Sequence, residues 1–164
     1  MPSIDQLNLQ INANDLCVIL DLGAADVDPN LIGKTGRTLL MTAASHGFDE
    51  AVMALIEIGA NVNVAGEQGI TPLHEAASNG HSRTAQILIQ AGALVNVVSF
   101  DGVTPLMCAA AWGFVDVAKI LIKHGADAAL RDRRGATAYE IASEKGEDLA
   151  SEFLATGQSP AGPS

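Results

Sequence analysis

Hydrophobic residues in the second half of the chain follow the spacing of short amphipathic helices. Between Val115 and Lys123, the apolar residues at 117, 118, 121 and 122 fall in one stripe along a helix. An alanine-rich segment precedes it and begins with Thr104-Pro105. This pair suits a helix start, because the threonine hydroxyl caps a free N–H and proline at the first helical position loses no bond. Gly113 lies between the two segments as a helix stop. The pattern predicts two short helices joined at a glycine.

The same pattern recurs every 33 residues through four copies. A Gly-x-Thr triplet opens each copy, a pair of small residues follows, and a second glycine ends the first helix. The triplets begin at Gly36, Gly69, Gly102 and Gly135, the small pairs at Ala43, Ala76, Ala109 and Ala142, and the stops are Gly47, Gly80, Gly113 and Gly146. Small residues let helices lie close together, and glycine takes the left-handed backbone of turns. Because one unit cannot cover its own apolar face, the units are expected to stack into a solenoid.

One copy carries a specific signature. Residues Thr71-Pro72-Leu73-His74-Glu75-Ala76 match the motif T-P-L-H-x-A in full. The segment 104–109 lacks only the histidine, 38–43 lacks proline and histidine, and 137–142 departs most. The chain therefore resembles an ankyrin-repeat protein. The resemblance covers roughly residues 2–157. It implies an all-α solenoid of stacked helix–turn–helix units with short β-hairpin turns between them.

The repeat frame makes residues 1–157 a single domain and residues 158–164 a disordered tail. Its units are an N-terminal cap repeat over about 2–32, repeats over about 33–65, 66–98 and 99–131, and a C-terminal cap repeat over about 132–157. In the N-terminal cap we expect helices over Ser3–Ile11 and Asp15–Ala24. The connection from Ala25 to Thr35 has three more residues than its later counterparts. A polar helix over Glu147–Leu154 is expected to close the array.

Composition narrows the classes of function. The chain is 48% hydrophobic and 4% aromatic, with a net charge of −10. Because nucleic acids and anionic membranes attract surfaces rich in Lys and Arg, we expect neither as a partner. No apolar run approaches the roughly 20 residues of a membrane span, and no signal segment opens the chain, so we expect a cytoplasmic protein. Cys17 and Cys108 form no metal-type pair and are expected to be reduced core residues.

Motifs for catalysis or ligand chemistry are incomplete. Gly33-Lys34-Thr35 resembles the end of a phosphate-binding loop, but Asp28 stands where that loop needs glycine. Residues 26–30 begin like a calcium-binding loop, whose sixth and twelfth positions are here Leu31 and Arg37. The histidines at 46, 74, 81 and 124 form no metal pair and no catalytic arrangement. We therefore expect no catalytic residue, no cofactor and no metal.

The resemblance assigns structural roles to three polar residues. His74 is expected to join the hydrogen-bond network between repeats. Asn63 and Asn96 occupy the hairpin asparagine position. This asparagine is hydroxylated in some eukaryotic members of the family, but a turn side chain that bonds its own backbone is the simpler interpretation.

In ankyrin-repeat proteins, partners bind at the hairpin tips and on the exposed side of the first helices. The matching positions here are Lys34, Thr35, Arg37, Ser45, His46, Glu67, Gln68, Ile70, Ser78, Asn79, Phe100, Asp101, Val103, Ala111, Trp112, Arg133, Arg134, Ala136, Glu144 and Lys145. Phe100, Val103 and Trp112 put apolar side chains where a solenoid does not need them, and tryptophan is enriched at binding hot spots. The alternative is that Phe100 and Trp112 pack within the chain. The basic cluster of Arg131, Arg133 and Arg134 either engages an acidic or phosphate group or forms a solvated hairpin tip.

We therefore expect a monomer that binds a protein partner, as adaptor or inhibitor, through its concave surface. The predicted partner-binding residues are Val98, Phe100, Val103, Trp112, Ile70, Asn79, His46, Arg133 and Arg134. Two other functions remain open. A small-ligand-binding or enzyme-accessory protein requires a pocket with convergent polar groups. A structural repeat unit would instead self-associate through its apolar helix face.

Overall fold

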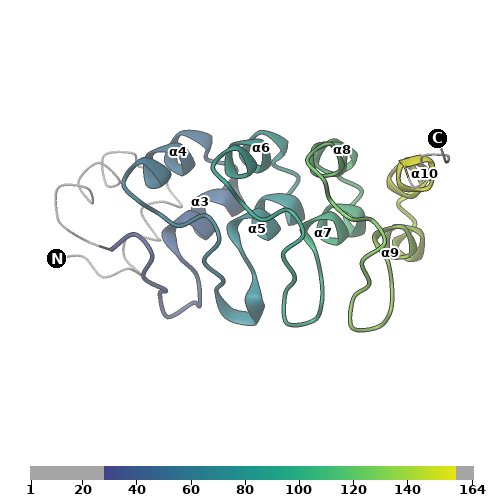
Figure 1. The fold of residues 1–164 in the computed structure, drawn as a ribbon, viewed down its shortest axis with the longest axis horizontal. Coiled ribbons are helices and arrows are strands. Elements are labelled where there is room, and N and C mark those ends of the chain that lie inside the picture. Colours follow the sequence, from purple (N-terminus) through teal and green to yellow (C-terminus); the bar gives the residue numbers. More distant parts are fainter. Residues whose placement is uncertain (1–27, 158–164) are drawn as a thin grey trace, which may run out of the picture.

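The computed structural model describes residues 28–157, which fold into helix pairs (Figure 1). The pairs are α3 (Leu39–His46) with α4 (Asp49–Glu57), α5 (Pro72–Ser78) with α6 (Ser82–Gln90), α7 (Pro105–Ala111) with α8 (Val115–Lys123), and α9 (Ala138–Lys145) with α10 (Asp148–Gly157). A single 3₁₀ turn, η1 (Glu67–Gly69), lies in one connection of this part of the chain. The predicted cap helices at 3–11 and 15–24 and the predicted tail at 158–164 lie outside the described residues.

The pairs stack side by side into a solenoid. The first helices α3, α5, α7 and α9 form one row, and the second helices α4, α6, α8 and α10 form another (Figure 1). Each helix packs against its counterpart in the next pair. The all-helical solenoid expected from the 33-residue period is therefore confirmed.

Helix starts and stops follow the sequence signals. Thr104 accepts a hydrogen bond from the Met107 backbone N–H at 3.2 Å, and Thr137 with Glu140 forms the predicted capping box. Gly47 ends α3 with φ +69°, a backbone conformation that glycine adopts without steric cost. Helix α8 begins at Val115 and ends at Lys123, as predicted. The last helix begins one residue later than predicted and extends to Gly157.

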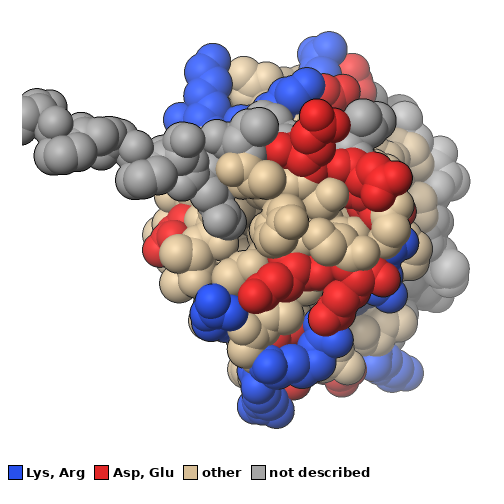
Figure 2. Space-filling model, turned by 90° about the vertical axis from the view of Figure 1, so that its right-hand side faces the viewer, with Lys and Arg blue, Asp and Glu red and all other residues tan. Residues whose placement is uncertain are grey.

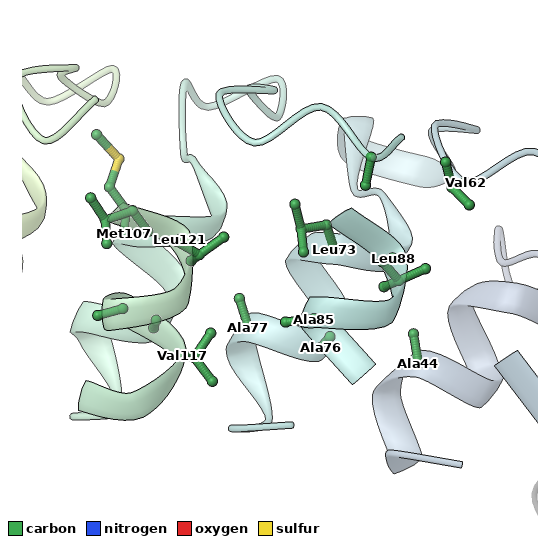
Figure 3. Close-up of a cluster of buried hydrophobic side chains, with 14 of the residues drawn as sticks. Ala44, Val62, Leu73, Ala76, Ala77, Ala85, Leu88, Met107, Val117 and Leu121 are labelled. Atoms are coloured by element: carbon green, nitrogen blue, oxygen red, sulfur yellow. The ribbon is translucent and has the colours of Figure 1, made fainter. Parts of the chain in front are cut away.

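The core is thin because alanines occupy the contacts between helices. In Figure 3, Ala76 and Ala77 of α5 lie close to Ala85 of α6, with Leu73 and Leu88 on the same two helices. All five are fully buried. Small side chains let the two helices approach, and the leucines fill the remaining space at the density of a protein interior. This packing fixes the orientation of the opposite, exposed side of each first helix.

The connections between helix pairs end in hydrogen-bonded turns, and no β-strand occurs within residues 28–157. In the hairpin before α7, the Ser99 N–H donates to the Val103 carbonyl at 2.9 Å, and the Gly102 N–H donates back to Ser99 at 2.9 Å. Neighbouring hairpins are also joined, since the Phe100 N–H donates to the Gln68 carbonyl at 2.8 Å. The hairpins therefore form a continuous row beside the first helices.

Asparagine side chains connect successive repeats, which corrects the expectation that they bond their own backbone. The Asn63 Nδ2 donates to the Gly92 carbonyl at 3.0 Å, and its Oδ1 accepts from the Leu94 N–H at 2.9 Å. Asn96 makes the same two bonds to the repeat that follows it. Because the partners are about 30 residues away in sequence, each asparagine clamps two repeats together.

Asn30 belongs to the same series, which locates the extra residues of the first connection. Its side chain bonds Gly59 and Asn61 in the next repeat. Asn30 precedes Gly36 by six residues, as Asn63 precedes Gly69. The three additional residues of this connection therefore come before Asn30.

Candidate functional site

Exposed side chains of the hairpins and of the first helices form one surface, here named the hairpin–helix surface. The Arg37 Nη1 of the first described hairpin lies 3.0 Å from the Glu75 Oε1 of α5. The Arg134 Nη1 of the last hairpin lies 3.7 Å from the Glu144 Oε2 of α9. Because these pairs connect the two kinds of element, a partner that touches the hairpins also meets the first helices.

Helix α7 presents an apolar side to this surface. Cys108, Ala111 and Trp112 are spaced three and four residues apart, so they lie on one side of the helix, with Trp112 at its C-cap. Trp112 is 64% exposed. The same positions on α5 hold Glu75, Ser78 and Asn79 and are polar. Of the predicted residues on the first helices, Trp112 is thus the one that offers a large apolar area.

Phe100 and Val98 lie on the connection before α7. Phe100 is 70% exposed and Val98 is 51% exposed. The edge of the Phe100 ring covers Gly69 of the preceding hairpin, where an added Cβ would come within 3.1 Å of Cδ1. Internal packing therefore accounts for only a minor part of the phenylalanine surface. Phe100 lies in the hairpin before α7 and Trp112 at its C-cap, so this helix, about 10 Å long, comes between them along the chain.

The other predicted residues differ in how far they reach the solvent. Val103 and Ile70 are half-buried, and Val103 packs against the core. His46 is exposed, and its ring stacks on Phe48 with centroids 5.3 Å apart. Asn79 is also exposed and donates to the Glu75 carbonyl of its own helix at 2.9 Å. His46 and Asn79 thus occupy the same column of the surface as Trp112, 33 residues apart.

The arginine cluster pairs with carboxylates of the chain itself. Arg131 lies 3.2 Å from Glu140, Arg133 lies 3.1 Å from Asp101, and Arg134 lies 3.1 Å from Asp132.

Asp132 holds its hairpin in place. Burial disfavours its charge, but hydrogen bonds from the Ala136 N–H and from Arg134 outweigh burial and lower its pKa.

Figure 2 shows acidic and basic side chains intermixed around the C-terminal end of the solenoid. The arginine cluster therefore does not form a continuous positively charged surface.

Two features of the surface were not predicted from the sequence. Glu75 is only 15% exposed in its ion pair with Arg37. Burial raises its pKa, and the nearby Arg37 charge opposes that rise. Cys108, expected in the core, is half-buried on the apolar side of α7, and burial raises the pKa of its thiol. The spacing of Cys108 to Ala111 and Trp112 is the signal that would have placed it on this surface.

His74 has a structural role. Its Nδ1 lies 3.2 Å from the Thr71 backbone nitrogen, and its Nε2 lies 2.9 Å from the Val103 carbonyl oxygen of the next repeat. The expected hydrogen-bond network between repeats is therefore present. Desolvation by burial lowers the pKa of His74, opposed by the bond to Val103, so the ring is neutral at pH 7.

Within residues 28–157, no three side chains of His, Cys, Asp or Glu gather to hold a metal ion. One open hollow of about 440 Å³ is lined by apolar residues of the segment 93–97 together with Asn96 and His124. Asn96 already uses its amide to clamp the next repeat. None of the helices in this part of the chain is sufficiently long and apolar to span a bilayer.

Stacked helix pairs, linked hairpins and one open side-chain surface define a helical-repeat solenoid, a class that works by presenting a surface. The family model for ankyrin repeats (3 copies) matches residues 7–99 and 94–161, and the chain belongs to the ankyrin-repeat family. Ankyrin repeats are generally protein–protein interaction modules, and theirs is a non-enzymatic interaction fold. No curated protein matched the chain in a sequence search.

Proposed function

We propose that this chain binds a partner protein through its hairpin–helix surface and acts as an adaptor or inhibitor. The observation that carries the proposal is the exposure of two large aromatic side chains in one repeat, 64% for Trp112 and 70% for Phe100. Each aromatic residue can bury about 150–250 Å², and such residues dominate the energetics of interfaces. This large aromatic area, left open to solvent, favours a role in binding a partner over a purely structural role.

Rigidity supports the same function. Helix α7 is anchored by the fully buried Ala109 and Ala110 and by Leu106. The hairpin before it is bonded to the preceding hairpin through Phe100 and Gln68. Because the scaffold is already ordered, little conformational entropy is lost on binding, and more of the contact energy appears as affinity.

Capture of binding proteins from cells of the source organism tests the proposal. The wild-type chain is compared with Trp112→Ala and with Leu94→Ala, where Leu94 is an equally exposed apolar residue away from the hairpin–helix surface. We expect Trp112→Ala to weaken the binding of a captured protein by about 30-fold, or about 2 kcal/mol. Leu94→Ala is expected to keep the wild-type affinity.

Thermal unfolding of the same variants shows whether Trp112 is a surface residue or a packing residue of the core. We expect the melting temperature of Trp112→Ala to stay close to that of the wild type, since most of the side chain is in solvent. A large loss of stability together with unchanged capture would show that Trp112 is a packing residue, and the proposal would be wrong.

A further inference from the structure

We infer that the partner presents an apolar polypeptide segment of little net charge, which lies along the repeat 99–131. This inference rests on the proposed function and adds the chemistry of the partner. Its basis is the row of side chains that this repeat contributes to the hairpin–helix surface. The row runs from the hairpin to the end of α7 and is here named the apolar row: Phe100, Val103, Cys108, Ala111 and Trp112.

The rows on both sides of the apolar row are more polar than it is. The equivalent positions of the preceding repeat are Glu67, Ile70, Glu75, Ser78 and Asn79, and those of the following repeat are Arg133, Ala136, Ile141, Glu144 and Lys145. Both neighbouring rows are polar at the positions of Phe100, Ala111 and Trp112, so the large exposed apolar area is confined to a strip one repeat wide. An extended segment or one side of a helix matches such a strip.

The charges of the hairpin–helix surface cancel, whereas those of the rest of the molecule do not. Residues 1–27 hold four of the nineteen acidic residues and none of the nine basic ones, so residues 28–157 have a net charge of −6. Six basic residues and six acidic residues lie on the hairpin–helix surface or pair there: Lys34, Arg37, Arg131, Arg133, Arg134 and Lys145 against Glu67, Glu75, Asp101, Asp132, Glu140 and Glu144. The excess negative charge of the described residues therefore lies elsewhere, on the second helices and the connections.

Most charges beside the apolar row are already paired. Arg133 pairs with Asp101 at 3.1 Å, and Arg37 pairs with Glu75 at 3.0 Å. A charged segment would have to compete with these existing partners for its own ion pairs, and exchanging one exposed pair for another gains little. A basic segment would be drawn to the acidic second-helix surface instead, and an acidic one would be repelled by the net charge. A neutral, apolar segment meets neither obstacle.

Selection of random peptides displayed on phage tests the inference with the full-length chain. Three forms are used as bait: the wild type, the double variant Phe100→Ser/Trp112→Ser, and Leu94→Asn. Leu94→Asn removes an exposed leucine outside the apolar row and introduces the residue found one repeat earlier at Asn61. Thermal unfolding and circular dichroism establish that all three baits are folded.

We expect the wild type and Leu94→Asn to enrich the same peptides, rich in large apolar residues and near zero in net charge. The double variant is expected to bind them at least tenfold more weakly. The affinity of synthetic copies should change less than about threefold from roughly 0.05 to 0.5 M NaCl, because screening acts on charged contacts.

The contrary outcomes separate the two proposals. Enrichment of strongly charged peptides that still require Phe100 and Trp112 would overturn the inference about partner chemistry and leave the proposed function intact. Peptides that bind the wild type and the double variant equally would overturn the proposed use of this surface. If no peptide binds the wild-type chain, the inference of a peptide-binding strip is also wrong.

Discussion

The Nε2 atom of His74 lies 2.9 Å from the carbonyl oxygen of Val103, 29 residues further along the chain. At the other side of the ring, Nδ1 lies 3.2 Å from the backbone nitrogen of Thr71. The Thr71 N–H can only donate, so Nδ1 accepts and Nε2 carries the proton that is donated to Val103. One neutral ring therefore caps α5 and joins two repeats. Protonation at Nδ1 would place two donors face to face.

This relationship predicts a loss of stability in mild acid. Burial lowers the pKa of His74 below its usual 6.5, so the unfolded chain binds this proton at a higher pH than the folded chain. As the pH falls from 6.5 through the folded-state pKa, the free energy of unfolding should decrease by at most about 1.4 kcal/mol per pH unit. Urea unfolding of the wild type across this range measures the decrease.

Two variants isolate the contribution of His74. His74→Met introduces the residue that the neighbouring repeats hold at Met41 and Met107, and it removes the titrating group. We expect the difference in unfolding free energy between wild type and His74→Met to shrink as the pH falls. His124→Gln, which replaces an exposed histidine at the C-cap of α8, controls for the loss of one histidine from the chain. A constant difference between wild type and His74→Met would contradict the prediction.

The asparagine side chains that join successive repeats are expected to contribute measurably to the free energy of unfolding. Asn63→Ala removes the bond to the Gly92 carbonyl at 3.0 Å and the bond from the Leu94 N–H at 2.9 Å. Because this half-exposed site is accessible to water, we expect a loss of about 1–2 kcal/mol in unfolding free energy. Asn79→Ala loses one hydrogen bond within its own helix. In urea unfolding, its loss of unfolding free energy should be only a few tenths of the loss in Asn63→Ala. Equal losses in the two variants would show that the clamp contributes no more than one hydrogen bond within a helix.

The period of the sequence was enough to predict the helices and their ends, because caps, glycine stops and apolar stripes are local properties. Thr104, Gly47 and the stripe of α8 act as the spacing indicated. The positions of Phe100 and Trp112 on the surface followed from the same frame, while their contact with a partner remains a prediction.

What could not be predicted are the contacts between repeats, since these depend on how far each unit is offset from the next. Nothing in the local sequence of Asn63 indicates that its amide reaches Gly92. For the same reason, Arg37 and Glu75 were not predicted to pair, because they are 38 residues apart in the sequence and meet only when the repeats stack. The stacking geometry also explains why Arg133 meets Asp101 of the preceding hairpin rather than solvent alone.

Close approach between repeats predicts unequal tolerance of two glycines. Gly80 and Gly92 both have positive φ, +76° and +93°, so alanine at either should cost about 1–2 kcal/mol of backbone strain. A Cβ on Gly80 would lie 2.7 Å from the Phe114 ring of the next repeat, whereas a Cβ on Gly92 would meet nothing within 4 Å.

We therefore expect Gly80→Ala to destabilise the chain by about 1–3 kcal/mol more than Gly92→Ala does. Thermal or urea unfolding of both variants measures the difference. If the two losses were equal, Phe114 would have moved aside without cost, and the contact would not restrict this position.

The half-buried pair of Arg37 and Glu75 predicts an effect of opposite sign to that of His74. Burial raises the pKa of Glu75 above its usual 4.5, despite the opposing charge of Arg37. Between 4.5 and the folded-state value, the folded chain binds more protons than the unfolded chain, so this group's contribution to stability falls as the pH rises. At neutral pH the charged carboxylate therefore opposes folding.

Glu75→Gln keeps the size of the side chain and removes the buried charge. We expect its unfolding free energy at pH 7 to match or exceed that of the wild type by up to about 1 kcal/mol. This gain should disappear below pH 4.5, where the wild-type carboxyl is protonated in both states. Arg37→Gln leaves the carboxylate without its nearest cation and should cost about 1–2 kcal/mol. Glu57→Gln, at an exposed residue that ends α4, controls for the change in net charge and should be neutral. A loss of stability in Glu75→Gln equal to that in Arg37→Gln would mean that the pair stabilises the solenoid outright, contrary to the direction given by burial.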